Sequence, residues 1–266
     1  MALNQLLSTA GLLRPARVGF CPACRVGLSG AAARGSSELA VPALAVAATL
    51  VAAGGAWAYT IARAGAMGEM AMGLGAWESF AGAWVAMMAA MMLPSAIPLI
   101  FEFARESEGR RAWPVATMLL ALTYLAVWLA FGLVCYAVYV ALGMPWPDQD
   151  LAAGVALILA GVYALTPLKR ASQARCRELC ALHGPLPFNL LRGAMIVGVR
   201  YGISCAGCSA GLMIAMVLIG MSNLLAAVVL AAAVLIYKLA PPLAWRSEMV
   251  LSLCLVATGV AYGLLA

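Results

Sequence analysis

Charged residues are scarce in this chain: they make up 10% of its 266 residues, whereas hydrophobic residues make up 65%. Soluble domains carry about 25% charged residues, so this composition excludes an ordinary soluble protein and indicates a polytopic protein whose main partner is the lipid bilayer. The net charge of +6 does not indicate a nucleic-acid partner, because the basic residues collect between apolar stretches, as orientation signals do.

The sequence also lacks the usual signatures of catalysis and energy coupling. It has one histidine, His183, which lies outside the apolar stretches, and it shows no catalytic triad and no paired-carboxylate site. It has neither a Walker-type Gly-Lys-Ser/Thr loop nor the Asp-Lys-Thr-Gly signature of P-type ATPases. We therefore expect a protein that is not an enzyme, and any transport would be passive, ion-coupled or powered by a partner.

Long apolar stretches predict the fold class. Each is long enough to cross a hydrocarbon core about 30 Å thick at about 1.5 Å per helical residue, and only helices satisfy their backbone groups within such a single segment. We predict an all-α bundle of about seven transmembrane spans over residues 39–266, in which the short fourth span ends at Pro167. The predicted spans are 39–62, 78–103, 113–140, 151–168, 194–219, 222–240 and 248–265.

The basic residues predict the orientation of these spans. All of the 16 Lys and Arg residues except Arg63 and Arg200 lie before the first span or in connections on one side of a seven-span bundle. The positive-inside rule then places the N-terminus in the cytoplasm and the C-terminus outside, in the inner (plasma) membrane. Residues 1–38 are expected to form a flexible cytoplasmic tail, because their early apolar residues precede the charges instead of following them as in a secretory signal.

Two cysteine pairs near the fifth predicted span are candidate metal ligands. Cys205 and Cys208, three residues apart within the span, share a helical face, so their sulfurs can converge on a soft metal or pair with each other. Cys176, Cys180 and His183 lie in the basic connection before it, and in a helix they would share one face. The neighbouring cations favour the thiolate form that binds metal. A reduced, solvated loop is the alternative for this connection.

The other cysteines carry less information. Cys21 and Cys24 in the N-terminal tail form half of a zinc-ribbon or metal-capture signature, and both a transient metal or redox role and incidental cysteines stay open. Cys135 and Cys254 are solitary within predicted spans, where a thiol behaves as a small hydrophobe.

Methionine is the second type of candidate ligand. Two groups stand out among the 15 methionines, one in the second predicted span and one in the outward connection before it. They are Met87, Met88, Met91 and Met92 in the span and Met67, Met70 and Met72 in the connection. Thioethers are soft ligands that suit Cu(I) and need no deprotonation. For the group in the span, simple filling of helix interfaces is the alternative, whereas the connection should be wet and packing does not explain its methionines.

Several segments together resemble one known family. They are AWVAMMAAMMLPS at 83–95, YALTPLK at 163–169, YGISCAGC at 201–208 and GMSN at 220–223. In these the chain is similar to an uncharacterised bacterial family of predicted metal-binding integral membrane proteins, some of which are labelled copper chaperones. The resemblance extends over most of the chain from about residue 40, and it implies an integral membrane protein that binds metal.

The fifth predicted span departs from the pattern of that family. The family has His-Gly-x-x-Cys-x-Gly-Cys-Cys-Trp, whereas here Tyr201 stands in place of the His, and Ser209 and Ala210 stand in place of the second Cys and the Trp. The ligand set that the resemblance implies is therefore reduced by an imidazole and a thiol, and Cys205 and Cys208 remain.

These soft side chains favour a protein that handles Cu(I), or another soft metal, through successive Met and Cys sites. Delivery to a copper-receiving membrane protein, assembly and transport all fit. The main rival is a transmembrane thiol–disulfide carrier, in which Cys205 and Cys208 exchange electrons with Cys176 and Cys180, although the outer connections contain no cysteine. A third possibility is a structural subunit in which Met and Cys only pack.

Overall fold

The computed structural model describes residues 40–66, 74, 76–144, 149–180, 189–219, 224–239 and 245–265. Within these residues all of the regular secondary structure is helical, which confirms the predicted fold class. The helices are α3 (Ala40–Ala66), α4 (Trp77–Glu106), α5 (Trp113–Ala141), α6 (Gln149–Ala164), α7 (Pro167–Cys180), α8 (Leu190–Ile219), α9 (Leu224–Leu239) and α10 (Trp245–Leu265).

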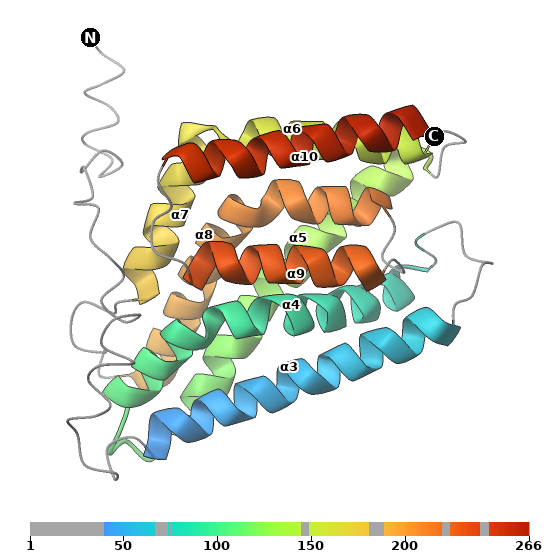
Figure 1. Cartoon of the computed structure of the whole chain (residues 1–266). Helices are drawn as coiled ribbons and strands as arrows, with labels where there is room; N and C mark the ends of the chain where they lie inside the picture. Colours follow the sequence, from blue (N-terminus) through green and yellow to red (C-terminus); the bar gives the residue numbers. More distant parts are fainter. Residues whose placement is uncertain are drawn as a thin grey trace.

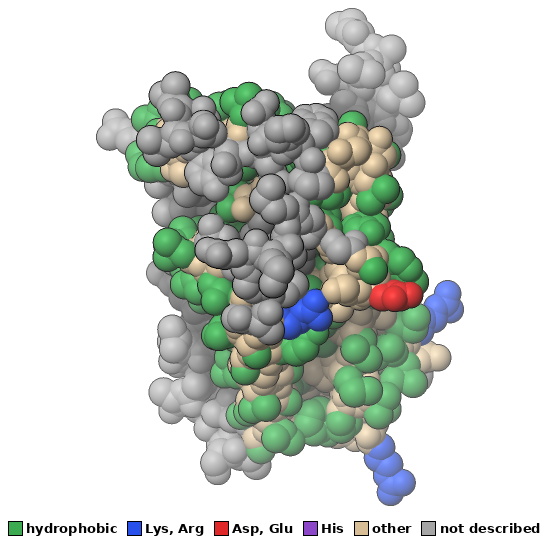
Figure 2. Space-filling model, turned by 90° about the vertical axis from the view of Figure 1, so that its right-hand side faces the viewer, with side chains coloured by type: hydrophobic (Ala, Val, Ile, Leu, Met, Phe, Trp, Pro, Cys, Tyr) green, Lys and Arg blue, Asp and Glu red, His purple; other side chains and the backbone are tan. Residues whose placement is uncertain are grey.

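The helices form one bundle in which most of them run between the same two ends (Figure 1). Successive helices alternate in direction, and α7 lies across the end at which α3 begins. Viewed from the opposite end, the described residues show hydrophobic side chains with few charged ones among them (Figure 2). The basic helix α7 lies at the other end of the bundle.

Four of the described helices, α3, α4, α5 and α8, are each long and apolar enough to cross a membrane. Helices α6 and α7 pass the same test only as a pair, and they are bent by 69° at the break between them. Helices α9 and α10 contain the shorter apolar segments Leu224–Leu235 and Ser252–Ala261. The predicted number of seven spans and the orientation of the termini stay predictions.

Helix α4 is the central helix and packs against α3, α5 and α9. Its buried side chains include all of the methionines of the second predicted span, together with Trp84, Leu99 and Phe103. Pro94 and Pro98 lie inside this helix. A proline has no N–H to donate to the preceding turn, so this part of α4 has backbone carbonyls that can accept hydrogen bonds from other helices.

The bend between α6 and α7 follows from the local sequence. Pro167 begins α7, a position at which a missing N–H costs nothing. The side-chain oxygen of Thr166 accepts a hydrogen bond from the backbone N–H of Lys169 at 3.4 Å, as a helix N-cap does. The sequence therefore ends one helix and starts another at this point, as predicted for the fourth span, and α7 is free to follow a different direction from α6.

Helix α7 buries one face against α8. Lys169, Gln173, Cys176 and Cys180 are its buried residues, and their spacing of four, three and four places them along a single stripe. The basic connection before the fifth predicted span is therefore a helix with a buried thiol face, and the alternative of a solvated loop is wrong for Cys176 and Cys180.

Two glycines allow α8 to lie directly against α5. A Cβ atom at Gly198 would come within 2.7 Å of the backbone oxygen of Leu120, and one at Gly202 within 2.9 Å of Val127 Cβ. Small residues four apart are the common device by which membrane helices approach closely. This contact sets the distance between the facing side chains of α5 and α8.

We expect Gly198→Ala to destabilise the protein by about 1–3 kcal/mol, the usual cost of forcing extra volume into a packed contact. The added methyl group meets a backbone oxygen, which cannot rotate away. Thermal unfolding in detergent would measure this as a lower Tm. The matched control is Gly55→Ala in α3, where a Cβ meets nothing within 4 Å. Equal changes in Tm for the two variants would show that the α5–α8 contact is not tight.

Candidate metal centre

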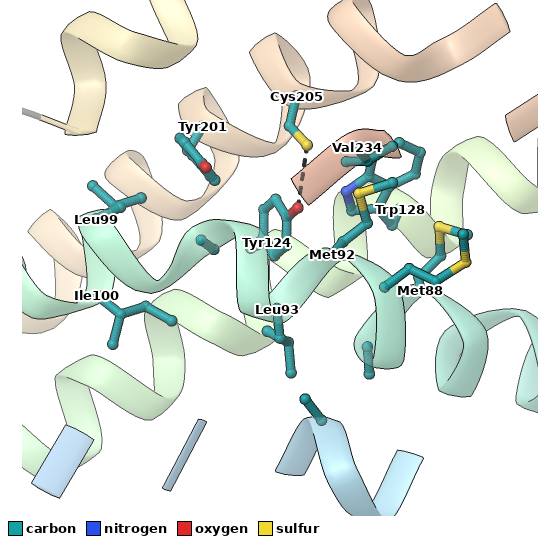
Figure 3. Close-up of a cluster of buried hydrophobic side chains, with 14 of the residues drawn as sticks. Met88, Met92, Leu93, Leu99, Ile100, Tyr124, Trp128, Tyr201, Cys205 and Val234 are labelled. Atoms are coloured by element: carbon teal, nitrogen blue, oxygen red, sulfur yellow. Dashed lines mark hydrogen bonds between the residues drawn. The ribbon is translucent and has the colours of Figure 1, made fainter. Parts of the chain in front are cut away.

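Cys205 lies in the middle of α8 and is fully buried, with an exposed fraction of 0%. Its sulfur is 3.2 Å from the hydroxyl oxygen of Tyr124 on α5, and either atom can be the donor (Figure 3). The close approach of the two helices at Gly202, one turn before Cys205, makes this contact possible. Cys205 therefore points toward α5 and into the bundle.

Tyr201 lies one turn before Cys205 on the same helix and is also buried. Its hydroxyl donates a hydrogen bond to the backbone oxygen of Ser95 on α4 at 3.1 Å, and its ring lies 5.4 Å from that of Tyr124. Ser95 follows Pro94 in the part of α4 that is interrupted by prolines. The hydrogen bond from Tyr201 thus connects α8 to α4 one turn away from Cys205.

Three buried thiols lie on two helices, α7 and α8. Cys205 is one turn further along α8 than Tyr201, and Cys176 and Cys180 lie on the face of α7 that is buried against α8. Cys176 is 5% exposed and Cys180 is 8% exposed, so both are shielded from solvent. We call Cys176, Cys180, Cys205 and Tyr201 the thiol cluster.

Cys208 lies outside the thiol cluster. Its thiol donates to the backbone oxygen of Cys205 at 3.2 Å and lies 3.5 Å from the hydroxyl oxygen of Ser209. It also lines a cavity of about 220 Å³, together with Lys169 and Tyr163. The two cysteines predicted to act as a pair therefore have different surroundings: Cys205 faces Tyr124 on α5, and Cys208 faces the cavity.

The methionines of α4 lie in the same hydrophobic core as the thiol cluster. Met88 and Met92 have an exposed fraction of 0%, and Met87 and Met91 one of 2%. Figure 3 shows Met92 beside Trp128 and Val234, with Met88 further along the helix. This dense apolar packing favours the interpretation of these side chains as interface fillers. Met67, Met70, Met72 and His183 lie outside the described residues, as do Cys21 and Cys24.

The donor chemistry of the thiol cluster fits a soft metal, because thiolates select Cu(I) over hard cations. The ligands are not arranged around one point: among the described residues, no three or more His, Cys, Asp or Glu side chains are positioned to hold one metal ion. The thiols come from two packed helices, α7 and α8. Closing on an ion therefore requires these side chains to move closer together.

Tyr124 is the site residue that the sequence did not reveal. It belongs to the buried stripe Ala116, Leu120, Tyr124 and Trp128, whose members are four residues apart on α5. That spacing marks the inward face of a helix in lipid, and a tyrosine on such a face needs a hydrogen-bond partner. The pattern could have identified Tyr124 as a residue with a buried partner, but not which residue that partner is.

We expect Tyr201→Phe to lower the stability by about 0.5–1.5 kcal/mol, the net contribution of one hydrogen bond. The ring would keep its packing, while the Ser95 carbonyl would lose the hydrogen bond from the phenol. Thermal unfolding in detergent measures the change, with Tyr59→Phe on the exposed face of α3 as the control, since Tyr59 is 45% exposed. A Tyr201→Phe protein as stable as the control would mean that the α4–α8 hydrogen bond contributes nothing.

Comparison with known proteins assigns the family. Residues 81–262 match the family model PpoB2, which is described as a copper chaperone. The match includes both the thiol cluster and the methionines of α4, and it confirms the resemblance seen in the sequence. No curated protein and no solved structure is similar enough to match the chain. By a match over more than half of its length, this chain belongs to the PpoB2 copper chaperone family.

Proposed function

We propose that this protein is a copper chaperone embedded in the bilayer, and that it binds Cu(I) through Cys176, Cys180 and Cys205. The observation that carries the proposal is the burial of these three thiols on α7 and α8, two helices that pack against each other. Membership of a copper chaperone family supports copper as the cargo. Thiolate ligands support the Cu(I) state.

In this proposal the hydroxyl group of Tyr124 stabilises the ionised form of Cys205. A thiolate accepts hydrogen bonds, and hydrogen bonds to a charged acceptor are stronger than those between neutral groups. Tyr124 lies 3.2 Å from the Cys205 sulfur, so its hydroxyl donates a hydrogen bond to that sulfur when Cys205 is ionised. The tyrosine thereby compensates part of the cost of a charged sulfur in an apolar interior.

The division of the thiols between two helices suits a cargo that must be released. Cys205 is fixed in the core of α8, whereas Cys176 and Cys180 lie on α7, which leaves α6 at 69° and packs mainly on α8. A small shift of α7 therefore removes two of the ligands at once. In this scheme the acceptor is a membrane protein that takes the ion as the site opens.

We further propose seven crossings of the inner membrane, with α7 lying at the cytoplasmic surface. The alternating directions of the helices support this topology, as does the position of α7 across one end (Figure 1). Helix α7 carries Lys169, Arg170, Arg175 and Arg177, and the opposite end has few charges (Figure 2). Basic residues concentrate on the cytoplasmic side of membrane proteins.

The proposal is tested by the copper content of detergent-purified protein under reductant, measured by mass spectrometry. We expect about one Cu(I) per wild-type chain, held by the soft thiol set. A Cys176→Ser/Cys180→Ser double variant and a Cys205→Ser variant should lose it, because each removes ligands that serine does not replace for a soft ion. Cys135→Ser on α5 is the matched control and should keep its copper. Equal copper content in all of these proteins would overturn the proposal.

Cys208→Ser distinguishes the thiol cluster from the alternative of a Cys205/Cys208 pair. Because Cys208 faces the cavity, we expect this variant to keep most of its copper. A loss as large as that of Cys205→Ser would show that the two cysteines of α8 hold the ion together, without the thiols of α7.

Tyr201→His should strengthen copper retention. Tyr201 is buried on α8 one turn before Cys205, so an imidazole there adds a nitrogen ligand that suits copper. We expect an increase in affinity of about tenfold, equivalent to about 1.4 kcal/mol. Competition with a Cu(I) chelator measures it, with Tyr136→His on α5 as the control. Unchanged affinity would mean that position 201 does not face the bound ion.

A further inference from the structure

A cavity of about 220 Å³ lies between α6, α8, α9 and α10, next to the start of α7. Most of its walls are aliphatic, with Leu212 on α8, Leu230 and Val234 on α9, and Leu255 on α10. The thiol of Cys208 also lines it. The cavity is therefore separate from the thiol cluster, although both lie against α8.

This cavity opens toward the lipid side of the bundle. Val229 on α9 lines it and is 56% exposed, and Cys254 on α10 lines it and is exposed as well. These exposed lining residues place the opening at α9 and α10, which pack mainly on α4 and on α6, respectively. An occupant that enters between them from a bilayer must be apolar over most of its length.

One charged side chain lines the cavity among the described residues. Lys169, which is 6% exposed, lies in the first turn of α7. The hydroxyl groups of Tyr163 and Thr258 also line the cavity, but they donate to the backbone oxygens of Gly207 and Cys254. Aliphatic walls with one cationic end complement an amphiphile that has an anionic headgroup.

The position of α7 favours a phospholipid as that amphiphile. Helix α7 lies across the end of the bundle and carries further basic residues, Arg170, Arg175 and Arg177. Clusters of basic residues at the ends of membrane helices attract the acidic lipids of the cytoplasmic leaflet, and basic pockets between helices bind their headgroups. Lys169, in the first turn of α7, belongs to this basic helix and also lines the cavity.

We propose that this cavity binds an acidic phospholipid, with its phosphate at the Lys169 ammonium group and one acyl chain between α9 and α10. The acyl chain covers the thiol of Cys208, because that thiol forms part of the cavity wall. Lipid occupancy therefore controls access to Cys208, while the thiol cluster stays sealed in either state. This inference is independent of copper.

Native mass spectrometry of the full chain, released from nanodiscs that contain phosphatidylglycerol and phosphatidylcholine, tests the proposal. The wild type should retain phosphatidylglycerol in preference, and Lys169→Gln should reduce that preference about fivefold, the effect of one basic residue at a membrane surface. Arg192→Gln, at an exposed cation on α8, is the matched control. Ala233→Phe fills the cavity without changing any charge and should also release the lipid.

Alkylation of Cys208 by N-ethylmaleimide, followed by peptide mass spectrometry, gives a second readout. Added phosphatidylglycerol should slow the reaction of the wild type but not that of Lys169→Gln. Three outcomes would overturn the proposal: equal retention of the two lipids by the wild type, identical behaviour of Lys169→Gln and Arg192→Gln, or cross-linking that finds a polypeptide segment in the cavity. Folding of each variant is checked by its Tm, and Ala233→Phe decides the matter if Lys169→Gln does not fold.

Discussion

The close packing of α8 against its neighbours determines the geometry of every site described above. Gly198 and Gly202 bring α8 against α5, and a Cβ atom at Gly207 would come within 2.7 Å of Ser172 on α7. Without a driving force from water, helices in lipid associate through such contacts between small residues. Gly202 sets the approach of Tyr124 to Cys205, and Gly207 lets the thiols of α7 come close to Tyr201. The positions of the residues in the thiol cluster therefore depend on glycines, which have no side chain that could bind a metal.

Much of the fold could be predicted from the sequence because lipid permits so few structures. Apolar stretches located the helices, and Pro167 located the break between α6 and α7. Helix ends were less accurate: α8 begins at Leu190, not at residue 194, because the side chain of Asn189 caps the helix by accepting a hydrogen bond from the backbone N–H of Arg192 at 3.2 Å. The angle of 69° at the break could not be predicted, since it depends on the packing of α7 against α8.

The candidate site was predicted only in part, for a similar reason. The helical face shared by Cys176 and Cys180 followed from their spacing alone. Spacing also placed Cys205 and Cys208 on one side of α8, yet Cys205 contacts Tyr124 while Cys208 faces a cavity. Which helices surround each sulfur is a property of the bundle, and it cannot be derived from the separation of two residues along one helix.

The presence of tyrosine at position 201 has a consequence for how an ion could leave the thiol cluster. Histidine is the side chain whose charge changes between about pH 5 and pH 8, and the described part of the cluster offers a phenol and thiols instead. Mild acidification therefore has no imidazole to protonate there. In the proposed copper site, an ion held by these sulfurs would leave when an incoming ligand displaces them one at a time, so its release would depend on encounter with an acceptor.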